Sequence, residues 1–345
     1  ASIGVGIMLA MGKKINLKER RVIRDAMNLD SGKGLIRFVK AIFCTTLLIE
    51  LLGAFLSFPV FFRDYPLPRA IGLSLFHSVA SFNNSGFDVL GNGTSLIPYQ
   101  KDVLLNLVTC VLVIAGGIGF PVIFELPLKH FSWKRQSMHT RVVLSTTFAL
   151  LLFGTLLLKL TESISWLGAF FYSVSARTAG FSTYNLGDFS TAGLLVVSGL
   201  MFIGASPAST GGGIKTTTFF VLMQEVRIIF SKRRLGAFRR RLPEESLAKA
   251  ATITLLGTIV VFVGTFMLCV LEPQHSFVQL LFEQISAYST AGLSMGITSS
   301  LHAASKAVLI VTMFIGRVGA FTLLSLWVSR PEPSAKYTEE AITIG

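Results

Sequence analysis

The chain has 345 residues, of which 52% are hydrophobic and only 14% are charged. Because soluble domains carry about 25% charged residues, this composition excludes an ordinary soluble domain and indicates an integral membrane protein. The net charge of +13 does not indicate a nucleic-acid partner, since 23 of the 31 basic residues fall in four segments that alternate with connections poor in Lys and Arg: 13–40, 129–141, 227–249 and the tail from 330. Such basic loops fix the orientation of helices in a membrane and attract anionic lipid.

The beginning of the chain carries an apolar stretch, residues 1–11, that is followed directly by Lys13 and Lys14. This stretch is too short to cross a bilayer, which takes about 20 residues. A signal peptide would carry its charges before the apolar stretch rather than after it. We therefore expect residues 1–11 to be the cytoplasmic end of a membrane helix that begins before residue 1.

From residue 34 onward, long apolar runs alternate with short segments rich in Ser, Ala and aromatic residues. The long runs cover residues 42–60, 103–124, 142–158, 194–203, 219–226, 250–271 and 307–328. The short segments cover residues 71–84, 166–177 and 277–290. A segment of about 12–14 residues can re-enter a membrane from one face but cannot cross it. The order long run, short segment, glycine and second long run occurs three times, which indicates repeated helix–re-entrant loop–helix units.

Each short segment ends in polar or small residues followed by a glycine. The three copies are Asn84-Ser85-Gly86, Thr178-Ala179-Gly180 and Thr290-Ala291-Gly292. Backbone carbonyls of an extended segment can replace the water shell of a cation, glycine permits the required backbone, and the C-terminal end of a preceding helix favours a positive charge. We therefore predict that these nine residues line an ion filter. The alternative, glycines that only allow close helix packing, does not explain why the pattern recurs.

The second copy has a returning helix that is interrupted by a proline and three consecutive glycines, a composition that ends a helix. We predict two helical parts, 194–203 and 216–230, joined by a loop that acts as a movable gate below the filter. The alternative is a static broken helix. The predicted gate residues are Gly204, Ala205, Ser206, Ser209, Thr210, Gly211, Gly212, Gly213, Lys215 and, from the last returning helix, Arg317.

Ionisable side chains within the apolar stretches are usually functional or paired. We expect Arg317 to bond carbonyls of the gate loop and, with Lys215, to raise a barrier to cations when the gate is shut. For Lys215 the alternative is that its amine extends to the cytoplasmic boundary. We expect Glu50 and His77 to be structural, whereas Glu283, on the last short segment, is a candidate for biasing the site toward cations.

Four sequences together resemble the Ktr/Trk/HKT potassium transporter superfamily, and most closely its KtrB-type membrane subunits: Phe82–Phe87, Arg177–Phe181, Gly204–Lys215 and Ile315-Gly316-Arg317. The resemblance covers nearly the whole chain. It implies an all-α integral membrane protein with pseudo-fourfold helix–pore loop–helix repeats around one central pore, the first repeat being largely missing from this sequence. The implied segments are the end of repeat 1 with a cytoplasmic loop (1–33), repeat 2 (34–130), repeat 3 with the gate loop (131–234), repeat 4 (235–330) and a tail (331–345).

The resemblance also implies a function, which is potassium uptake by the ion-translocating subunit of a Ktr/Trk-type system. The filter residues are then expected to bind potassium, in a multi-pass protein of a bacterial plasma membrane whose basic loops are cytoplasmic. The implied partners are a second copy of the chain, a cytoplasmic ring of nucleotide-binding regulatory subunits, and membrane lipid. No cofactor is expected in this chain apart from the transported or activating ion, potassium or sodium. The choice between these ions is left open, because the first filter strand is missing.

Two rival functions deserve comparison. Residues 292–296 match the serine-hydrolase pattern G-x-S-x-G, but their place in the repeat explains them better, so we expect no enzyme and no catalytic residue. The second rival is a sodium- or proton-coupled secondary transporter with discontinuous helices. Such coupling uses buried acids, and the apolar runs offer Glu50 and Glu125, neither of them beside a filter glycine in the sequence. This favours a channel-like path.

Overall fold

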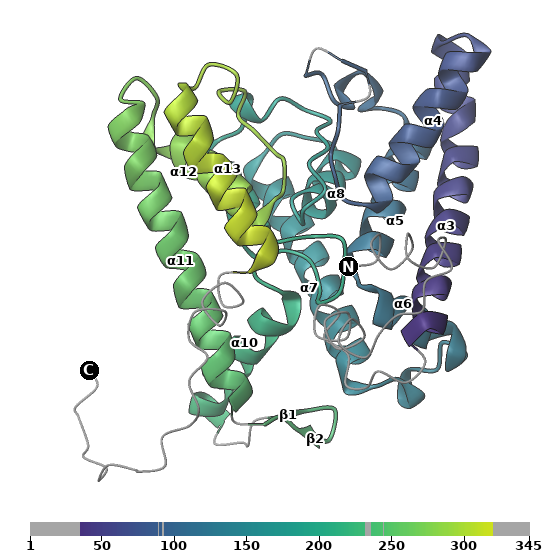
Figure 1. Ribbon diagram of the computed structural model, residues 1–345, viewed down its shortest axis with the longest axis vertical. Coiled ribbons are helices and arrows are strands. Elements are labelled where there is room, and N and C mark those ends of the chain that lie inside the picture. Colours follow the sequence, from purple (N-terminus) through teal and green to yellow (C-terminus); the bar gives the residue numbers. More distant parts are fainter. Residues whose placement is uncertain (1–34, 89, 92, 232–235, 244, 320–345) are drawn as a thin grey trace.

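The computed structural model describes residues 35–88, 90–91, 93–231, 236–243 and 245–319, which form a largely helical protein (Figure 1). The predicted segment 1–33 and the predicted tail 331–345 lie outside these residues. The described residues form three units, each with a long outer helix, a short helix and a returning helix. This arrangement agrees with the all-α prediction.

The elements of the three units follow one another in chain order. Unit A consists of α3 (Leu35–Asp64), α4 (Leu67–Phe82), η1 (Ile97–Tyr99), α5 (Val103–Gly117) and α6 (Phe120–Leu128). After η2 (Trp133–Arg135), unit B consists of α7 (Met138–Thr161), α8 (Trp166–Ser175), η3 (Leu186–Asp188), α9 (Thr191–Phe202) and α10 (Thr216–Ser231). After an antiparallel pair of β1 (Gly236–Ala237) and β2 (Arg240–Arg241), unit C consists of α11 (Glu245–Leu271), α12 (Phe277–Ser289) and α13 (Ala303–Val318).

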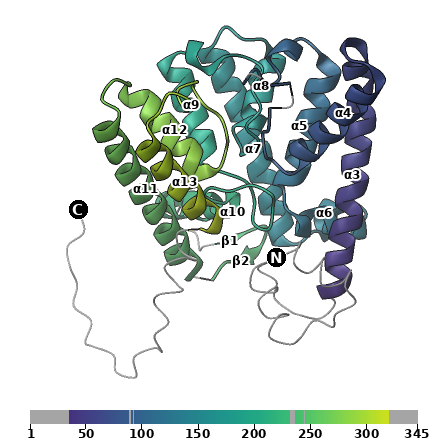
Figure 2. The ribbon, with the colours of Figure 1, turned by 45° about the horizontal axis from the view of Figure 1, so that its top comes forward.

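The outer helices contain the stretches that are long and apolar enough to cross a membrane: Lys40–Asp64, Met138–Thr161 and Glu245–Leu271. The short helices α4, α8 and α12 have 16, 10 and 13 residues, which is too few to cross. In Figures 1 and 2 all three short helices lie toward the end of the molecule opposite the β1–β2 pair. They therefore enter from one face, as re-entrant segments do.

Capping side chains and a proline in the first turn mark the beginnings of the short helices. The Ser165 hydroxyl accepts a hydrogen bond from the Gly168 backbone N–H (3.0 Å) at the beginning of α8. At the beginning of α12, Ser276 and Gln279 form a reciprocal capping box, which satisfies two backbone donors that the helix leaves free. Pro68 occupies the first turn of α4, where its missing N–H carries no cost.

The returning helix of unit A departs from the predicted continuous run 103–124. It breaks into α5 and α6, whose axes differ in direction by 97°. Gly119 at the break has a φ of 90°, and the Phe120 backbone N–H donates to the Ala208 carbonyl of unit B (3.1 Å). The bend therefore depends on a contact between units, which an apolar sequence pattern does not reveal.

Units B and C each close the outer ends of their two long elements with a buried or partly buried carboxylate. In unit B the Glu162 carboxylate accepts from the Ser190 backbone N–H (3.0 Å) and hydroxyl (2.6 Å), and Ser190 is the N-cap of α9. In unit C the fully buried Glu272 carboxylate accepts from the backbone N–H of His302, the N-cap of α13 (2.6 Å). The recurring carboxylate at this place supports the internal repeat independently of the glycines.

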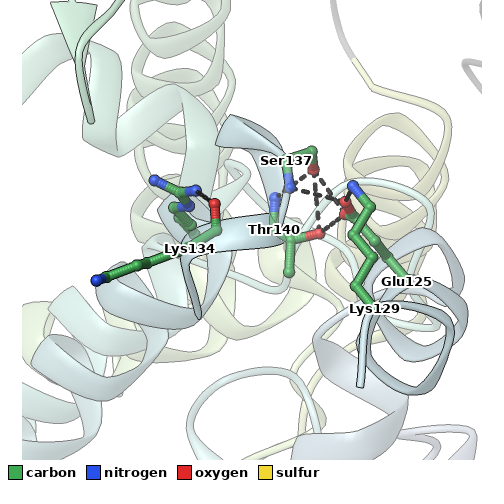
Figure 3. A network of polar contacts seen from close by, with 6 residues as sticks. Glu125, Lys129, Lys134, Ser137 and Thr140 are labelled. Atoms are coloured by element: carbon green, nitrogen blue, oxygen red, sulfur yellow. Dashed lines mark hydrogen bonds and ion pairs between the residues drawn. The ribbon is translucent and has the colours of Figure 1, made fainter. Parts of the chain in front are cut away.

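A carboxylate also joins units A and B at the end of the molecule that carries the basic loops. Glu125 on α6 accepts hydrogen bonds from the Ser137 backbone N–H (2.7 Å), the Ser137 hydroxyl (2.6 Å), the Thr140 hydroxyl and the Lys129 amine (Figure 3). Ser137 is the N-cap of α7. Because this carboxylate satisfies donors at a helix start, it is structural and not free to couple transport to another ion.

Replacing Glu125 by alanine is expected to lower the free energy of unfolding by about 2 kcal/mol, because it leaves buried donors without an acceptor. The measurement is the thermal unfolding midpoint of the purified protein in detergent. The control is Asp188→Asn, since Asp188 is exposed. An unchanged midpoint for Glu125→Ala would contradict the structural role.

Candidate ion filter and gate loop

The three predicted filter segments (84–86, 178–180 and 290–292) share one backbone conformation. In each of them the first and third residues have positive φ angles: Asn84 51°, Gly86 61°, Thr178 78°, Gly180 82°, Thr290 52° and Gly292 82°. A positive φ is uncommon for residues other than glycine and costs them about 1–2 kcal/mol. Its recurrence at the same place in three units shows that the segments have the same shape, and the surrounding structure holds them in it.

The filter segments converge on one another. A Cβ atom added to Gly180 would lie 2.6 Å from the Ala291 carbonyl oxygen and 3.3 Å from the Gly86 Cα. A Cβ on Gly292 would lie 3.4 Å from the Gly180 Cα, and one on Gly86 would overlap with the Ala179 carbonyl oxygen. Only backbone therefore fits where the three segments meet, which is the arrangement that brings carbonyl oxygens close to a dehydrated cation.

The short helices hold these segments at their C-terminal ends. The backbone N–H groups of Ser85, Ala179 and Ala291 donate to carbonyls in the last turns of α4 (3.0 Å), α8 (2.9 Å) and α12 (2.9 Å). Three helix C-termini, each the negative end of a helix dipole, thus lie next to the glycines. This electrostatic arrangement favours a cation at the meeting point.

The glycines in the centres of the returning helices have a different role, which is close contact with the short helices. A Cβ on Gly116 would overlap with the Phe82 carbonyl at the end of α4, and one on Gly316 would overlap with the Tyr288 carbonyl of α12. Gly204 breaks this pattern, because a Cβ there would overlap with the carbonyl of Gly212 in its own unit. In unit B the interrupted segment therefore folds back on itself where the other units place a helix.

This gate loop (204–215) lies against two filter segments. A Cβ on Gly211 would overlap with the Thr178 hydroxyl, and a Cβ on Gly212 with the Thr290 hydroxyl. The two glycines thus bring loop backbone into contact with the residues that begin the filter segments of units B and C. The loop therefore lies directly beside the filter segments of units B and C.

Backbone hydrogen bonds join the loop to unit A. The Ser206 N–H donates to the Gly117 carbonyl (3.0 Å) and the Thr210 N–H to the Gly116 carbonyl (3.2 Å). Within unit B, the Ser206 and Thr216 hydroxyls lie 2.9 Å apart, and the Ser209 hydroxyl donates to the Ser206 carbonyl (2.6 Å). The loop is a hydrogen-bonded structure rather than an open connection.

Two cations bond carbonyls of the gate loop. The Lys215 amine donates to the Gly211 carbonyl (2.7 Å), and the Arg317 guanidinium, from α13 of unit C, donates to the Thr210 carbonyl. Lys215 therefore turns toward the loop and does not extend away from it. The structure brings both predicted cations to adjacent carbonyls of one loop.

A cavity of about 590 Å³ adjoins the filter between unit A and unit C. Its wall includes Asn83 to Ser85, the Gly292 filter residue, Glu283 of α12 and Arg317 of α13. Among the lining residues Glu283 is the only acid and Arg317 the only base. The filter is thus open to one side, the side on which no unit is described.

Glu283 turns its carboxylate toward the segment that follows the filter in unit C. It accepts hydrogen bonds from the Ser294 hydroxyl (2.6 Å), the Met295 backbone N–H (3.0 Å) and the Thr298 hydroxyl (2.9 Å). Only 5% of Glu283 is exposed. Its contacts assign it to holding this segment, a role that the sequence prediction of a cation bias did not include.

Tyr172 holds the segment that follows the filter in unit B, a role that was not predicted from the sequence. Its hydroxyl accepts from the Tyr184 backbone N–H (3.1 Å) and donates to the Tyr184 carbonyl. Tyr172 stands eight residues before Gly180, and Glu283 nine residues before Gly292. A polar atom about two helical turns before the filter glycine was the available signal.

The structure also places the two residues that were expected to be structural. His77 is fully buried, with its Nε2 2.9 Å from the Thr109 hydroxyl and its ring 5.3 Å from that of Phe181. Glu50 of α3 accepts from the Asn83 side-chain amide (2.7 Å). Asn83 precedes the filter segment of unit A, so Glu50 lies closer to the filter than its sequence position indicated.

Among the described residues no group of three or more His, Cys, Asp or Glu side chains could hold a metal ion.

Comparison with known proteins agrees with this geometry. Residues 3–339 match the family model TrkH, described as "Cation transport protein". The chain belongs to the TrkH family of cation transport proteins. It is 34% identical to the Ktr system potassium uptake protein B of Bacillus subtilis (strain 168), over 100% of this chain and 79% of that protein. It is 36% identical to the potassium/sodium uptake protein NtpJ of Enterococcus hirae, over 96% of this chain and 77% of that protein.

A solved structure shows the same fold as this TrkH-family chain. The crystal structure of the potassium transporter TrkH from Vibrio parahaemolyticus matches with a TM-score of 0.70 and 20% sequence identity, over 90% of this chain and 68% of that one. The membership and the fold confirm the resemblance that the sequence analysis drew from the filter and gate motifs.

Proposed function

We propose that this TrkH-family protein takes up potassium as the ion-translocating subunit of a Ktr/Trk-type system, with the cation passing between the filter segments. The observation that carries the proposal is the convergence of Gly86, Gly180 and Gly292, because a Cβ on Gly180 has no room. Relatives named as potassium or potassium/sodium uptake proteins support the choice of ion. Potassium is the expected occupant of the filter, and sodium is the expected competitor.

The packing between units supports a fourth unit of the same kind. The returning helix of one unit packs on the short helix of the next, α5 on α8 and α9 on α12. By this rule α13 lacks a following short helix, and α4 lacks a preceding returning helix, within the described residues. The 590 Å³ cavity lies between these two helices, at the end of α4 and along α13. A further unit there would supply a fourth filter strand and take part in selecting potassium over sodium.

The loop 204–215 is proposed to act as the gate, since it lies against two filter segments and is held by two cations. The basic connection 129–141 and the described parts of the basic connection 227–249 lie at the end opposite the short helices. Both connections are proposed to be cytoplasmic, in the plasma membrane of a bacterium. A second copy of the chain and a cytoplasmic regulatory ring are the proposed partners. The presence of "Ktr system" in the names of two relatives supports a multi-subunit assembly.

Uptake of rubidium, a potassium substitute, tests the function. The full-length protein is expressed in cells that lack their own potassium uptake, and uptake is measured with and without sodium. We expect saturable rubidium uptake that unlabelled potassium inhibits more strongly than sodium does. Absence of uptake under every condition would overturn the proposal.

A coupled transporter is the second candidate, because Glu50 bonds Asn83 beside the filter. Coupling through this carboxylate predicts that uptake requires a sodium or proton gradient and that Glu50→Gln abolishes the requirement. The channel-like path predicts uptake that follows the membrane voltage and the potassium gradient alone. Liposomes with imposed gradients separate the two.

Replacing Glu283 by alanine is expected to lower rubidium uptake by about tenfold, because three donors of the segment after the filter lose a buried acceptor, a cost of about 1–3 kcal/mol for each unpaired group. The loss should lie in ion affinity and in discrimination against sodium. Glu283→Gln keeps one acceptor oxygen and should restore part of the activity. The measurement is the rubidium concentration dependence with and without sodium.

Ser294→Ala serves as the milder companion variant. It removes one of the three contacts of Glu283 and should reduce uptake only modestly. Since Ser294 is the serine of the G-x-S-x-G pattern, the same variant distinguishes a transporter from a hydrolase.

Equal effects of Glu283→Ala and Glu283→Gln on every parameter would contradict a positioning role for the Glu283 carboxylate.

A further inference from the structure

A charged side chain lies buried beside the filter segment of unit B. Arg177 directly precedes Thr178, the first residue of that segment, and only 6% of Arg177 is exposed. An arginine keeps its positive charge inside a protein. The residues at the same place in units A and C are neutral, namely Asn83 and Ser289. Unit B thus brings one positive charge to the filter, and the proposed path of the ion makes no use of it.

The contacts of Arg177 are too few to explain it as an anchor between helices. Its Nη2 lies 3.5 Å from the Thr147 hydroxyl of α7, beyond the usual range of a hydrogen bond, and its Nε has no partner within the described residues. No ion pair joins Arg177 to a carboxylate in that part of the chain. Asn83 of unit A, by contrast, donates to the Glu50 carboxylate at 2.7 Å. Because a buried charge without a good partner is costly, anchoring does not account for Arg177.

The charge of Arg177 stands at the C-terminal end of a short helix. α8 ends at Ser175, and the Arg177 backbone N–H donates to the Val174 carbonyl in its last turn (3.1 Å). This end is the negative pole of the helix dipole, which favours a cation at the filter glycines. A positive charge there offsets the dipole, and salt screens it little because the side chain is buried. Neither α4 nor α12 has a basic residue in its last turn, so unit B attracts the ion less strongly than units A and C.

An ion filter needs a limit on its own affinity. Conduction requires that ion binding be favourable enough for entry and weak enough for release. Carbonyls of three segments and three helix ends all attract the cation here, and a site with attraction alone would retain it. The Arg177 side chain reaches toward α7, whereas only backbone fits where the filter glycines meet. The guanidinium therefore acts on the ion through its electric field and not by contact.

We propose that Arg177 sets the affinity of the filter, because its buried charge weakens cation binding between the filter glycines and speeds release of the ion. This role differs from that of Arg317, whose guanidinium bonds the Thr210 carbonyl of the gate loop. The inference rests on the proposed function and deepens it, since it names a further residue that determines how tightly the same filter holds its ion.

Replacing Arg177 by glutamine removes the charge and keeps a side-chain donor for Thr147. In the full-length protein we expect the KM for rubidium uptake to fall by about fivefold, as for the loss of a charge at a helix end. The maximal rate should fall too, because the ion leaves more slowly. Titration calorimetry of the purified protein with rubidium should show the same tighter binding. Arg177→Lys keeps the charge and should keep the KM, and so should the control Arg135→Gln, which removes a charge from an exposed side chain of η2.

A pair of variants at Thr147 tests the charge with Arg177 in place. Thr147→Asp puts a carboxylate beside the guanidinium, offsets its field, and should lower the KM for rubidium in the same direction as Arg177→Gln. Thr147→Val has nearly the same shape without a charge and should leave the KM unchanged. An equal fall of the KM in Thr147→Val would show a structural tie and overturn the proposal. An unchanged KM in either Arg177→Gln or Thr147→Asp, when that variant is folded, would also overturn it.

Protein levels in the membrane and thermal midpoints identify variants that do not fold. If Arg177→Gln does not fold, Thr147→Asp decides, and loss of folding in both would assign Arg177 to stability and overturn the proposal. Rubidium uptake by the unmodified protein separates the two claims. Normal uptake with an unchanged KM in the variants refutes the affinity role alone, whereas no uptake by the unmodified protein refutes the proposed function.

Discussion

Replacing Gly180 by alanine is expected to reduce rubidium uptake by at least about tenfold. Gly180 has a φ of 82°, which costs alanine about 1–2 kcal/mol, and 1.4 kcal/mol corresponds to a factor of ten. In addition, the new methyl group would lie 2.6 Å from the Ala291 carbonyl oxygen and 3.3 Å from the Gly86 Cα. The filter segments of all three units must then move apart, and carbonyls that contact the ion lose their positions. Uptake at several rubidium concentrations measures the effect.

The matched control is Gly199→Ala in α9 of the same unit. No atom lies within 4 Å of a Cβ added to Gly199, and alanine favours a helix over glycine by about 1 kcal/mol. This variant should keep full uptake and equal or higher stability. Protein levels in the membrane and thermal midpoints separate loss of transport from loss of folding. Normal uptake by a folded Gly180→Ala protein would show that the ion does not pass between these glycines.

Replacing Arg317 by alanine is expected to raise rubidium uptake by up to about tenfold. Its guanidinium donates to the Thr210 carbonyl, and a hydrogen bond from a charged group contributes about 1.5–3 kcal/mol when buried, less here because Arg317 is exposed. Loss of this bond releases the gate loop from unit C. Removal of the positive charge also lowers the electrostatic barrier to cations below the filter. The measurement is the initial rate of uptake in cells and in liposomes.

Lys306→Ala is the control on the same helix. Its amine also donates to a backbone carbonyl, that of Ser299 (2.9 Å), but far along α13 from the gate loop. This variant should leave the rate of rubidium uptake unchanged.

Lys215→Ala should act in the same direction as Arg317→Ala, since the Lys215 amine donates to the adjacent Gly211 carbonyl. An unchanged rate and unchanged regulation in Arg317→Ala would contradict a gating role.

The elements that could be predicted from the sequence are those with a strong local signal. The short segments were expected at 71–84, 166–177 and 277–290, and the helices occupy 67–82, 166–175 and 277–289. The helix break was predicted because a proline and three glycines admit no helix. The parts of the broken helix lie at 191–202 and 216–231, within three residues of the expected bounds.

Features that depend on contacts between units could not be predicted. The bend at Gly119 interrupts an apolar run, and it is held by the Ala208 carbonyl, which lies almost 90 residues further along the chain. The left-handed conformations of Thr178 and Thr290 carry no sequence signal, because threonine does not favour them. In the same way, Glu283 and Tyr172 anchor different segments with different chemistry, and they share only the place of a polar side chain about two helical turns before the filter glycine.

The filter glycines are the part of the candidate site that the sequence predicts best. The alignment of three glycines identified the residues that meet at one point, because glycine is the only residue that permits both the φ angle and the close approach. The gate loop's position beside Thr178 and Thr290 did not follow from its composition alone. It follows from the hydrogen bonds that unit A and unit C make to its backbone.

The most direct test of a carbonyl-lined filter is to locate the ion by crystallography of the full-length protein grown in rubidium, using the anomalous scattering of that ion. We expect a peak on the axis between the backbone carbonyls of the filter segments at Gly86, Gly180 and Gly292, and its loss or displacement in the Gly180→Ala protein. A rubidium peak beside Glu50 with no peak at the glycines would contradict a carbonyl-lined filter and support a coupled transporter instead.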